Sequence, residues 1–179
     1  MTNKYMIAYL PSKEVSDYAT KLINEMAEKF NEKYLIENPR PVHATLKSPF
    51  EIEDIKPIED SVEVFAKEQK SADVSADGFE DFRGRVFFLR TNFSEGAIEI
   101  QKALIEKLRE FKEIYIDRYD EQFTPHLTVG YANSPESHEG IIEHLNTIPR
   151  PEFDFKFDNI TILKKVDNAW EIHKRFGIK

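Results

Sequence analysis

The first third of the chain changes from a strand-like to a helix-like pattern and then to an extended segment. Residues 4–10 form a short, mostly apolar run that ends at a proline, which is typical of a buried strand. Apolar residues then recur at three- to four-residue spacing over 15–30, which predicts one face of a helix with Ser12 as its N-cap. The segment 38–41 holds two prolines, so it ends any helix and leads into an extended run.

The rest of the chain repeats this alternation of strand and helix patterns. Strands are predicted at 42–47, 72–82, 85–90, 125–131, 153–157, 160–162 and 170–176, and Pro49 is expected to close the first of these. Three more helices are predicted: one that Pro57 opens, one that Ser94 caps and whose apolar face reaches Phe111, and one from Ser134 that ends before Pro149.

This order of elements resembles a strand–helix–strand unit used twice. It predicts an α+β fold that is bilobal, with two mixed, largely antiparallel sheets in a pseudo-two-fold arrangement and helices on the outer faces. No low-complexity linker separates the halves, and a length of 179 residues suits one domain. We therefore expect residues 1–179 to form a single bilobal domain.

The composition supports a folded protein and removes several kinds of chemistry. Hydrophobic residues make up 40% of the chain, and 14 Phe and 7 Tyr supply bulk for a core. The absence of cysteine excludes disulfides, thiolate metal sites and a cysteine nucleophile. No apolar run is long enough to cross a bilayer, and the first ten residues are too polar for a signal peptide, so a cytoplasmic location is expected.

The charge limits the partners. A formal net charge of −8 is spread along the chain, whereas proteins that grip long nucleic acids usually carry a basic stripe. An extended nucleic-acid surface is therefore not expected. A small phosphorylated ligand or a single RNA end needs only a few local donors and fits this charge.

Two short segments share a pattern that carries acid–base chemistry. The first holds His43 and Thr45, and the second holds His126 and Thr128. Residues two apart in a strand point to the same face, so each imidazole should lie beside its hydroxyl. An imidazole can give or take a proton near neutral pH, and a hydroxyl can donate to a phosphoryl oxygen.

Both segments fall in strand-like runs that follow a proline, and two such pairs exceed what chance gives in a chain with five histidines. The other histidines lack this setting. His138 and His144 lie in a predicted polar helix and His173 in the last predicted strand.

The segments Val42-His43-Ala44-Thr45-Leu46 and Pro125-His126-Leu127-Thr128-Val129 resemble the paired His-x-Thr motifs of the 2H phosphoesterase superfamily. This superfamily includes 2′-5′ RNA ligase-like proteins and cyclic phosphodiesterases. The length and the opening strand are similar to its small prokaryotic branch. The second motif departs from the pattern by having Pro125 in its leading position.

The resemblance implies a metal-independent hydrolase without a cofactor, acting on a 2′,3′-cyclic phosphate or a related diester of an RNA end or small nucleotide. One of His43 and His126 would be the general base and the other the general acid. Thr45 and Thr128 would bind the non-bridging oxygens. Which histidine is the base, the regiochemistry of ring opening and the natural substrate stay open at this point.

Other interpretations use the same residues. A metal site at the two histidines lacks any His-x-x-His or His-Glu-x-x-His spacing, and a P-loop is absent. A non-catalytic module that binds a phosphate or an RNA end has the same sequence pattern, and 2′-5′ ligation differs only in direction and substrate. Turnover separates the binding module from the enzyme.

Several neighbours of the motifs are weaker candidates for substrate binding. Lys47 is expected on the strand face of His43 and Thr45, where it could offset phosphate charge or simply form a solvated strand end. Tyr131 and Phe50 follow the motifs and could stack on a base, although aromatic residues here are mostly expected in the core. Arg83 and Arg85 form the best local basic cluster, and ordinary surface charge is their favoured interpretation.

Overall fold

Eight strands and six helices make up the fold, and the computed structural model describes all of residues 1–179. The strands are β1 (Asn3–Tyr9), β2 (Ala44–Ile52), β3 (Ala72–Phe82), β4 (Val86–Phe93), β5 (His126–Tyr131), β6 (Glu152–Phe157), β7 (Asn159–Val166) and β8 (Ala169–Gly177). The helices are α1 (Lys13–Phe30), α2 (Tyr34–Glu37), α3 (Lys56–Glu68), α4 (Glu95–Leu108), α5 (Arg118–Glu121) and α6 (Pro135–Thr147).

The strands form two four-stranded sheets of matching design. One has the order β2-β1-β7-β8 and the other β5-β4-β3-β6. Every ladder is antiparallel. The strand that carries a His-x-Thr motif lies at an edge in both sheets, and the two edge strands contact each other. The predicted bilobal α+β fold is confirmed.

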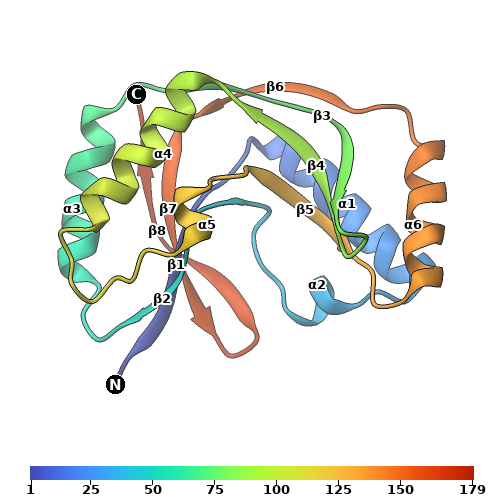
Figure 1. Ribbon diagram of the computed structural model, residues 1–179, viewed down its shortest axis with the longest axis horizontal. Coiled ribbons are helices and arrows are strands. Elements are labelled where there is room, and N and C mark those ends of the chain that lie inside the picture. The colour runs from blue at the N-terminus through green and yellow to red at the C-terminus, as the bar shows by residue number, and fades with distance from the viewer.

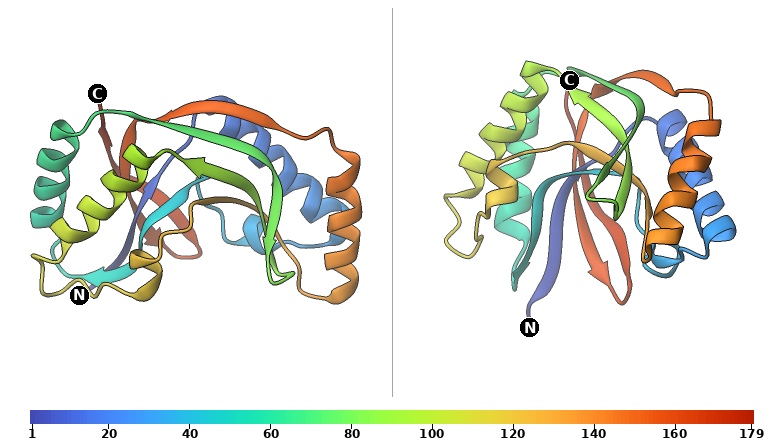
Figure 2. Two further views of the ribbon diagram at one scale, coloured as in Figure 1. Left: turned by 45° about the horizontal axis from the view of Figure 1, so that its top comes forward. Right: turned by 45° about the vertical axis from the view of Figure 1, so that its right-hand side comes forward.

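The helices flank the pair of sheets, with α3 and α4 on one side and α1 and α6 on the other (Figures 1 and 2). The predicted N-caps Ser12 and Ser94 are confirmed, and Ser134 caps the helix that it was predicted to open: each hydroxyl accepts a bond from a backbone N–H in the first helical turn. None of the helices combines the length and the apolar character that a membrane crossing requires.

One helix ties the lobes together. The chain enters α1 from β1 and leaves it toward β2, both in the first sheet, yet α1 packs against β5 of the second sheet. Its buried face includes Leu22 and Met26, and Met26 lies against Gly130 of β5. Because α1 is connected to the first sheet and packs on the second, it fixes the position of the second His-x-Thr strand relative to the first.

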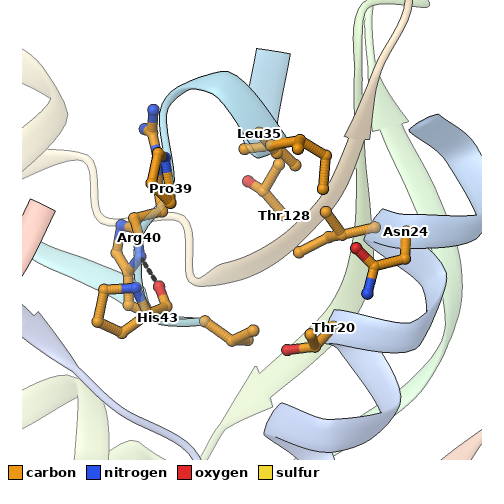
Figure 3. Close-up of a pocket in the computed structure, with 11 residues that line it drawn as sticks. Thr20, Asn24, Leu35, Pro39, Arg40, His43 and Thr128 are labelled. Carbon is orange, nitrogen blue, oxygen red and sulfur yellow. Dashed lines mark hydrogen bonds between the residues drawn. The ribbon is translucent and has the colours of Figure 1, made fainter. Parts of the chain in front are cut away.

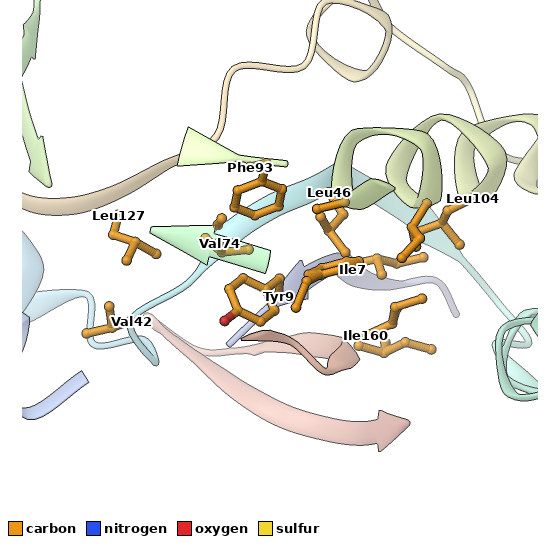
Figure 4. Close-up of a cluster of buried hydrophobic side chains, with 14 of the residues drawn as sticks. Ile7, Tyr9, Val42, Leu46, Val74, Phe93, Leu104, Leu127 and Ile160 are labelled. Carbon is orange, nitrogen blue, oxygen red and sulfur yellow. The ribbon is translucent and has the colours of Figure 1, made fainter. Parts of the chain in front are cut away.

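The core runs continuously through both lobes. A single cluster of 37 buried residues includes Ile7 and Leu46 of the first sheet and Phe93 and Leu127 of the second (Figure 4). Tyr9 lies where the lobes meet, with its ring edge-on to Phe93 at 5.8 Å between centroids. Burial of apolar surface in this shared core holds the two edge strands at a fixed separation.

Two sequence predictions of local structure are wrong, and two short helices were missed. Pro49 does not close its strand, because β2 is an edge strand and a proline without a ladder hydrogen bond is tolerated there. The helix α4 ends at Leu108 rather than Phe111, which lies in a following turn. The four-residue helices α2 and α5 were not predicted, since each is too short to show a periodic pattern.

Candidate functional site

Both motif histidines are fixed in the same way by their own chain. His43 directly precedes β2 and His126 is the first residue of β5, and both side chains are half-buried. Nδ1 of His43 lies 2.7 Å from the carbonyl oxygen of Pro41, and Nδ1 of His126 lies 2.8 Å from that of Thr124. A carbonyl oxygen only accepts, so Nδ1 carries the proton in each ring. Nε2 is then the nitrogen without a proton in each neutral ring.

Aromatic packing also holds His126 in place. The rings of Phe82 and Phe88 lie edge-on to its imidazole, with centroids 4.9 and 5.3 Å away. Phe88 pairs with Thr128 across the β4–β5 ladder, so it lies on the motif face of the sheet. Contact on two sides therefore restrains the orientation of this ring.

The predicted alternation along both motifs is present in the structure. Ala44 and Leu127 have no exposed surface and belong to the core, whereas Thr45 and Thr128 are half-buried on the opposite face. Each threonine hydroxyl therefore lies on the same side of its strand as the histidine two residues before it.

The four motif residues line two cavities. The smaller, of about 200 Å³, is lined by His43 and Thr128, and Figure 3 shows them with Arg40 opposite Thr20 and Asn24 of α1. The larger, of about 790 Å³, is lined by Thr45 and His126. Each cavity thus combines a histidine of one motif with the threonine of the other.

Burial favours the neutral form of both imidazoles, and nearby positive charge adds to this effect at His43. The pKa of His43 is lowered to about 4, chiefly by burial and also by the charges of Arg40 and His126, against the opposing hydrogen bond to Pro41. Burial also lowers the pKa of His126. The two rings sense each other's charge, so protonation of one opposes protonation of the other.

Arg40 is a site residue that the sequence patterns did not single out. It is half-buried, lines the smaller cavity and has no carboxylate partner. Its guanidinium lies 5.4 Å from the centroid of the Tyr34 ring, which packs edge-on against Tyr131 at 4.8 Å. Arg40 sits between two prolines, which indicate an extended segment but say nothing about its distance from His43.

Free arginines gather around the two cavities. Arg90, Arg109, Arg150 and Arg175 all form ion pairs with carboxylates. By contrast, the arginines without a carboxylate partner all line cavities beside the motif strands or the adjoining β3–β4 turn: Arg40, Arg83, Arg85 and Arg118. In a chain with a net charge of −8 this placement concentrates positive charge where an anion could bind.

The two aromatic residues predicted as weaker candidates for substrate binding lie in different places. Tyr131 lines the larger cavity together with His126 and Thr45. Phe50 is buried in the core against Tyr5, with ring centroids 6.2 Å apart, so the prediction that it could stack on a base is wrong.

Lys47 does not lie on the motif face. A β-bulge between β1 and β2 leaves Leu46 unpaired, so Thr45 pairs with Ala8 while Lys47 pairs with Ile7 of the core. The Lys47 side chain is 1% exposed, and its ammonium group lies 2.9 Å from the carboxylate of Asp120. The predicted role of Lys47 in offsetting phosphate charge is therefore wrong, because the bulge reverses its face and the ion pair neutralises it.

No group of three or more His, Asp or Glu side chains gathers in an arrangement that could hold a metal ion. The two imidazoles line these cavities, together with Asp81 and Asp120 in the larger one, and hydroxyls and guanidinium groups surround them as hydrogen-bond donors.

Comparisons of sequence agree with these features. The profile of the 2'-5' RNA ligase superfamily matches residues 15–169, which include both motifs. A protein of Geobacillus sp. (strain WCH70) named "Putative phosphoesterase" is 26% identical over 97% of this chain and 95% of its own length. A protein of the same name from Bacillus pumilus (strain SAFR-032) is 22% identical over 97% of this chain and 96% of its own.

Comparisons of structure support the fold. The apo form of E. coli LigT superimposes with a TM-score of 0.63 at 17% identity, covering 100% of this chain and 99% of LigT. The protein TT0787 of Thermus thermophilus gives a TM-score of 0.60 at 16% identity, covering 98% of this chain and 97% of its own.

Proposed function

Because the chain belongs to the 2'-5' RNA ligase superfamily, which confirms the predicted 2H phosphoesterase relationship, we propose that it is a phosphoesterase with His43 and His126 as its acid–base pair. The observation that carries the proposal is the matched state of the two imidazoles. Each is half-buried at the start of an edge strand, and each has Nδ1 bonded to a carbonyl two residues earlier. Two Nε2 atoms are thereby available to one phosphodiester.

The proposed reaction is hydrolysis of a 2′,3′-cyclic phosphate or a related diester. Nε2 of His43 takes a proton from water as its oxygen bonds to phosphorus, and Nε2–H of His126 gives a proton to the departing ribose oxygen. The P–O bond to that ribose oxygen breaks, which yields a phosphomonoester and a free hydroxyl. His43 is assigned as the base because its pKa of about 4 keeps it deprotonated over the wider pH range.

Thr45 and Thr128 complete the proposed site. Their hydroxyls lie on the motif faces of two facing strands, one in each cavity, and donate to the two non-bridging oxygens. Arg40, free of any carboxylate, offsets the negative charge that grows on those oxygens. Side chains supply both proton transfers and the charge stabilisation, so the proposed mechanism uses no metal ion or other cofactor.

A nucleotide-type substrate is favoured by what similar proteins bind. Crystal structures of E. coli LigT contain 3'-AMP in one case and ATP in another. The larger cavity, about 790 Å³, lies within the range of roughly 300–1,000 Å³ that is usual for small-molecule sites. An RNA terminus or a small nucleotide fits this space, and we propose that residues 1–179 act on it as one domain.

The test uses purified, EDTA-treated protein with 2′,3′-cyclic mononucleotides and a cyclic-phosphate-ended oligonucleotide. We expect phosphomonoester formation in the wild type and a loss of about 10²–10⁴-fold in each of His43→Ala and His126→Ala. His173→Ala is the matched control, because this histidine pairs with Glu59 outside both cavities. Binding without turnover would favour the non-catalytic module, joining of two RNA ends would favour the ligase, and activity that survives either motif variant would refute the two-histidine mechanism.

A further inference from the structure

A short exposed helix presents an aromatic ring and a cation to the larger cavity. The four-residue helix α5 contributes Arg118 and Tyr119, and both line this cavity together with Thr45 and His126. The Tyr119 side chain is 66% exposed. The guanidinium of Arg118 lies 4.7 Å from the ring centroid, and one of its N–H groups donates to the phenol oxygen at 2.7 Å. The guanidinium therefore covers one face of the ring, while most of the residue stays exposed.

Buried polar contacts anchor this helix to the first motif strand. A helix of four residues is not stable by itself. Asp120 of α5 accepts from the backbone N–H of Ser48 at 2.7 Å and forms the buried ion pair with Lys47. The hydroxyl of Ser48 donates to Asp117, the N-cap of α5, also at 2.7 Å.

A residue of α4 closes the same network. The amide nitrogen of Gln101 donates to the carbonyl oxygens of Leu46 and Asp120, at 3.0 and 2.9 Å. The buried bonds of Lys47, Ser48 and Gln101 thus hold a helix whose outer side chains are exposed. This places Tyr119 at a fixed distance from Thr45, which a flexible loop would not do.

The charge on this helix also suits a nucleotide. Arg118 has no carboxylate partner, and only one of its guanidinium N–H groups is used, by Tyr119. A guanidinium has five N–H donors, so several remain for phosphate oxygens. Exposed aromatic rings beside a free cation are the usual platform for a nucleobase and its adjoining phosphate.

We propose that Tyr119 and Arg118 form a second subsite, which binds the nucleotide next to the one that carries the scissile phosphate. The base of that nucleotide stacks on the open face of Tyr119, and its phosphodiester contacts Arg118. This inference rests on the proposed function and specifies its substrate: an oligonucleotide end is preferred over a mononucleotide.

The experiment compares two substrates, a 2′,3′-cyclic mononucleotide and a dinucleotide that ends in the same cyclic phosphate. The wild type should show the higher kcat/KM with the dinucleotide. In Tyr119→Ala the dinucleotide-to-mononucleotide ratio of kcat/KM should fall about 5- to 150-fold, which corresponds to ~1–3 kcal/mol of base stacking. Tyr119→Phe keeps the stacking ring and should retain most of this ratio. Arg118→Gln removes a positive charge, so it should lower the ratio and make the ratio less dependent on salt concentration.

The matched control is Tyr115→Ala, since Tyr115 precedes α5, is 80% exposed and does not line the larger cavity. Its ratio should equal that of the wild type. A ratio that is unchanged in Tyr119→Ala, or lowered equally in Tyr115→Ala, would overturn the subsite.

A binding measurement separates this inference from the proposed function. Calorimetric titration with a mononucleotide 3'-phosphate and a dinucleotide 3'-phosphate needs no turnover. If no diester is hydrolysed, the proposed function fails. The subsite would still be supported if Tyr119→Ala binds the dinucleotide more weakly than the wild type does but binds the mononucleotide equally well. If hydrolysis depends on both motif histidines but Tyr119→Ala leaves both the kinetic ratio and dinucleotide binding unchanged, only the subsite fails.

Discussion

Replacing Asp120 by alanine should destabilise the protein far more than removing an exposed carboxylate. The side chains of Lys47 and Asp120 are 1% and 2% exposed, and their charged atoms are 2.9 Å apart. The carboxylate also accepts from the backbone N–H groups of Ser48 at 2.7 Å and Asp117 at 3.0 Å. Asp120→Ala leaves a buried ammonium group and two backbone N–H groups without this acceptor.

The expected cost follows from the loss of one member of a buried pair. Such a change typically lowers the free energy of unfolding by about 3–5 kcal/mol, because the remaining charge stays desolvated. At ~2–4 °C per kcal/mol for a chain of this size, Tm should fall by about 6–20 °C. The double variant Lys47→Met with Asp120→Ala removes both charges. Its loss of unfolding free energy should therefore be smaller than the sum of the losses in the two single variants.

Urea denaturation of the two single variants and the double variant gives this comparison as a double-mutant cycle. Asp60→Ala is the matched control, because Asp60 pairs with Lys56 on the exposed surface of α3 and should contribute about 0.5 kcal/mol or less. A loss below about 1 kcal/mol in Asp120→Ala, or strict additivity in the cycle, would refute the conclusion that this pair anchors α5.

Three further predictions concern the proposed reaction. Thr45→Val and Thr128→Val should each lower kcat by about 10–10³-fold with unchanged far-UV circular dichroism, since a charge-stabilising donor is lost while the shape is kept. With rising pH, kcat/KM should first increase through the pKa of His43, about 4, as the base loses its proton. It should then decrease through the pKa of His126, which is lowered from 6.5, as the acid loses its proton. An optimum above pH 8 would contradict the assigned roles. Arg40→Met should raise the pKa of His43, because a neighbouring positive charge is removed. An NMR titration of the imidazole in which that pKa stays the same or falls would contradict the placement of Arg40 beside His43.

The predictions that held depend on neighbours along the chain. Ser12 and Ser94 cap helices because a hydroxyl three residues before a backbone N–H can accept from it, which the local sequence specifies. The shared face of His43 and Thr45 follows from the strand period of two. The recurrence of this pair at His126 and Thr128 indicates the family from the order of residues alone.

The predictions that failed depend on contacts between distant residues. Counting positions puts Lys47 on the motif face, but the ladder with β1 contains a bulge at Leu46 that counting cannot reveal. Phe50 follows the first motif closely enough to be a stacking candidate, yet its packing against Tyr5 places it in the core. No pattern singles out Arg40, because its proximity to His43 depends on how the segment between α2 and β2 folds.

The sequence by itself determined the two motifs, the faces of their strands and the capped helices, because periodicity and caps act over three or four residues. Only the tertiary structure decided that α1 packs on the opposite sheet, that the edge strands β2 and β5 meet, and that α5 is anchored beside Thr45. These features arise from burial of a core shared by both lobes and from hydrogen bonds across 55 to 72 residues of chain. Such long-range contacts leave no periodic trace along the sequence, so they become visible only in the folded molecule.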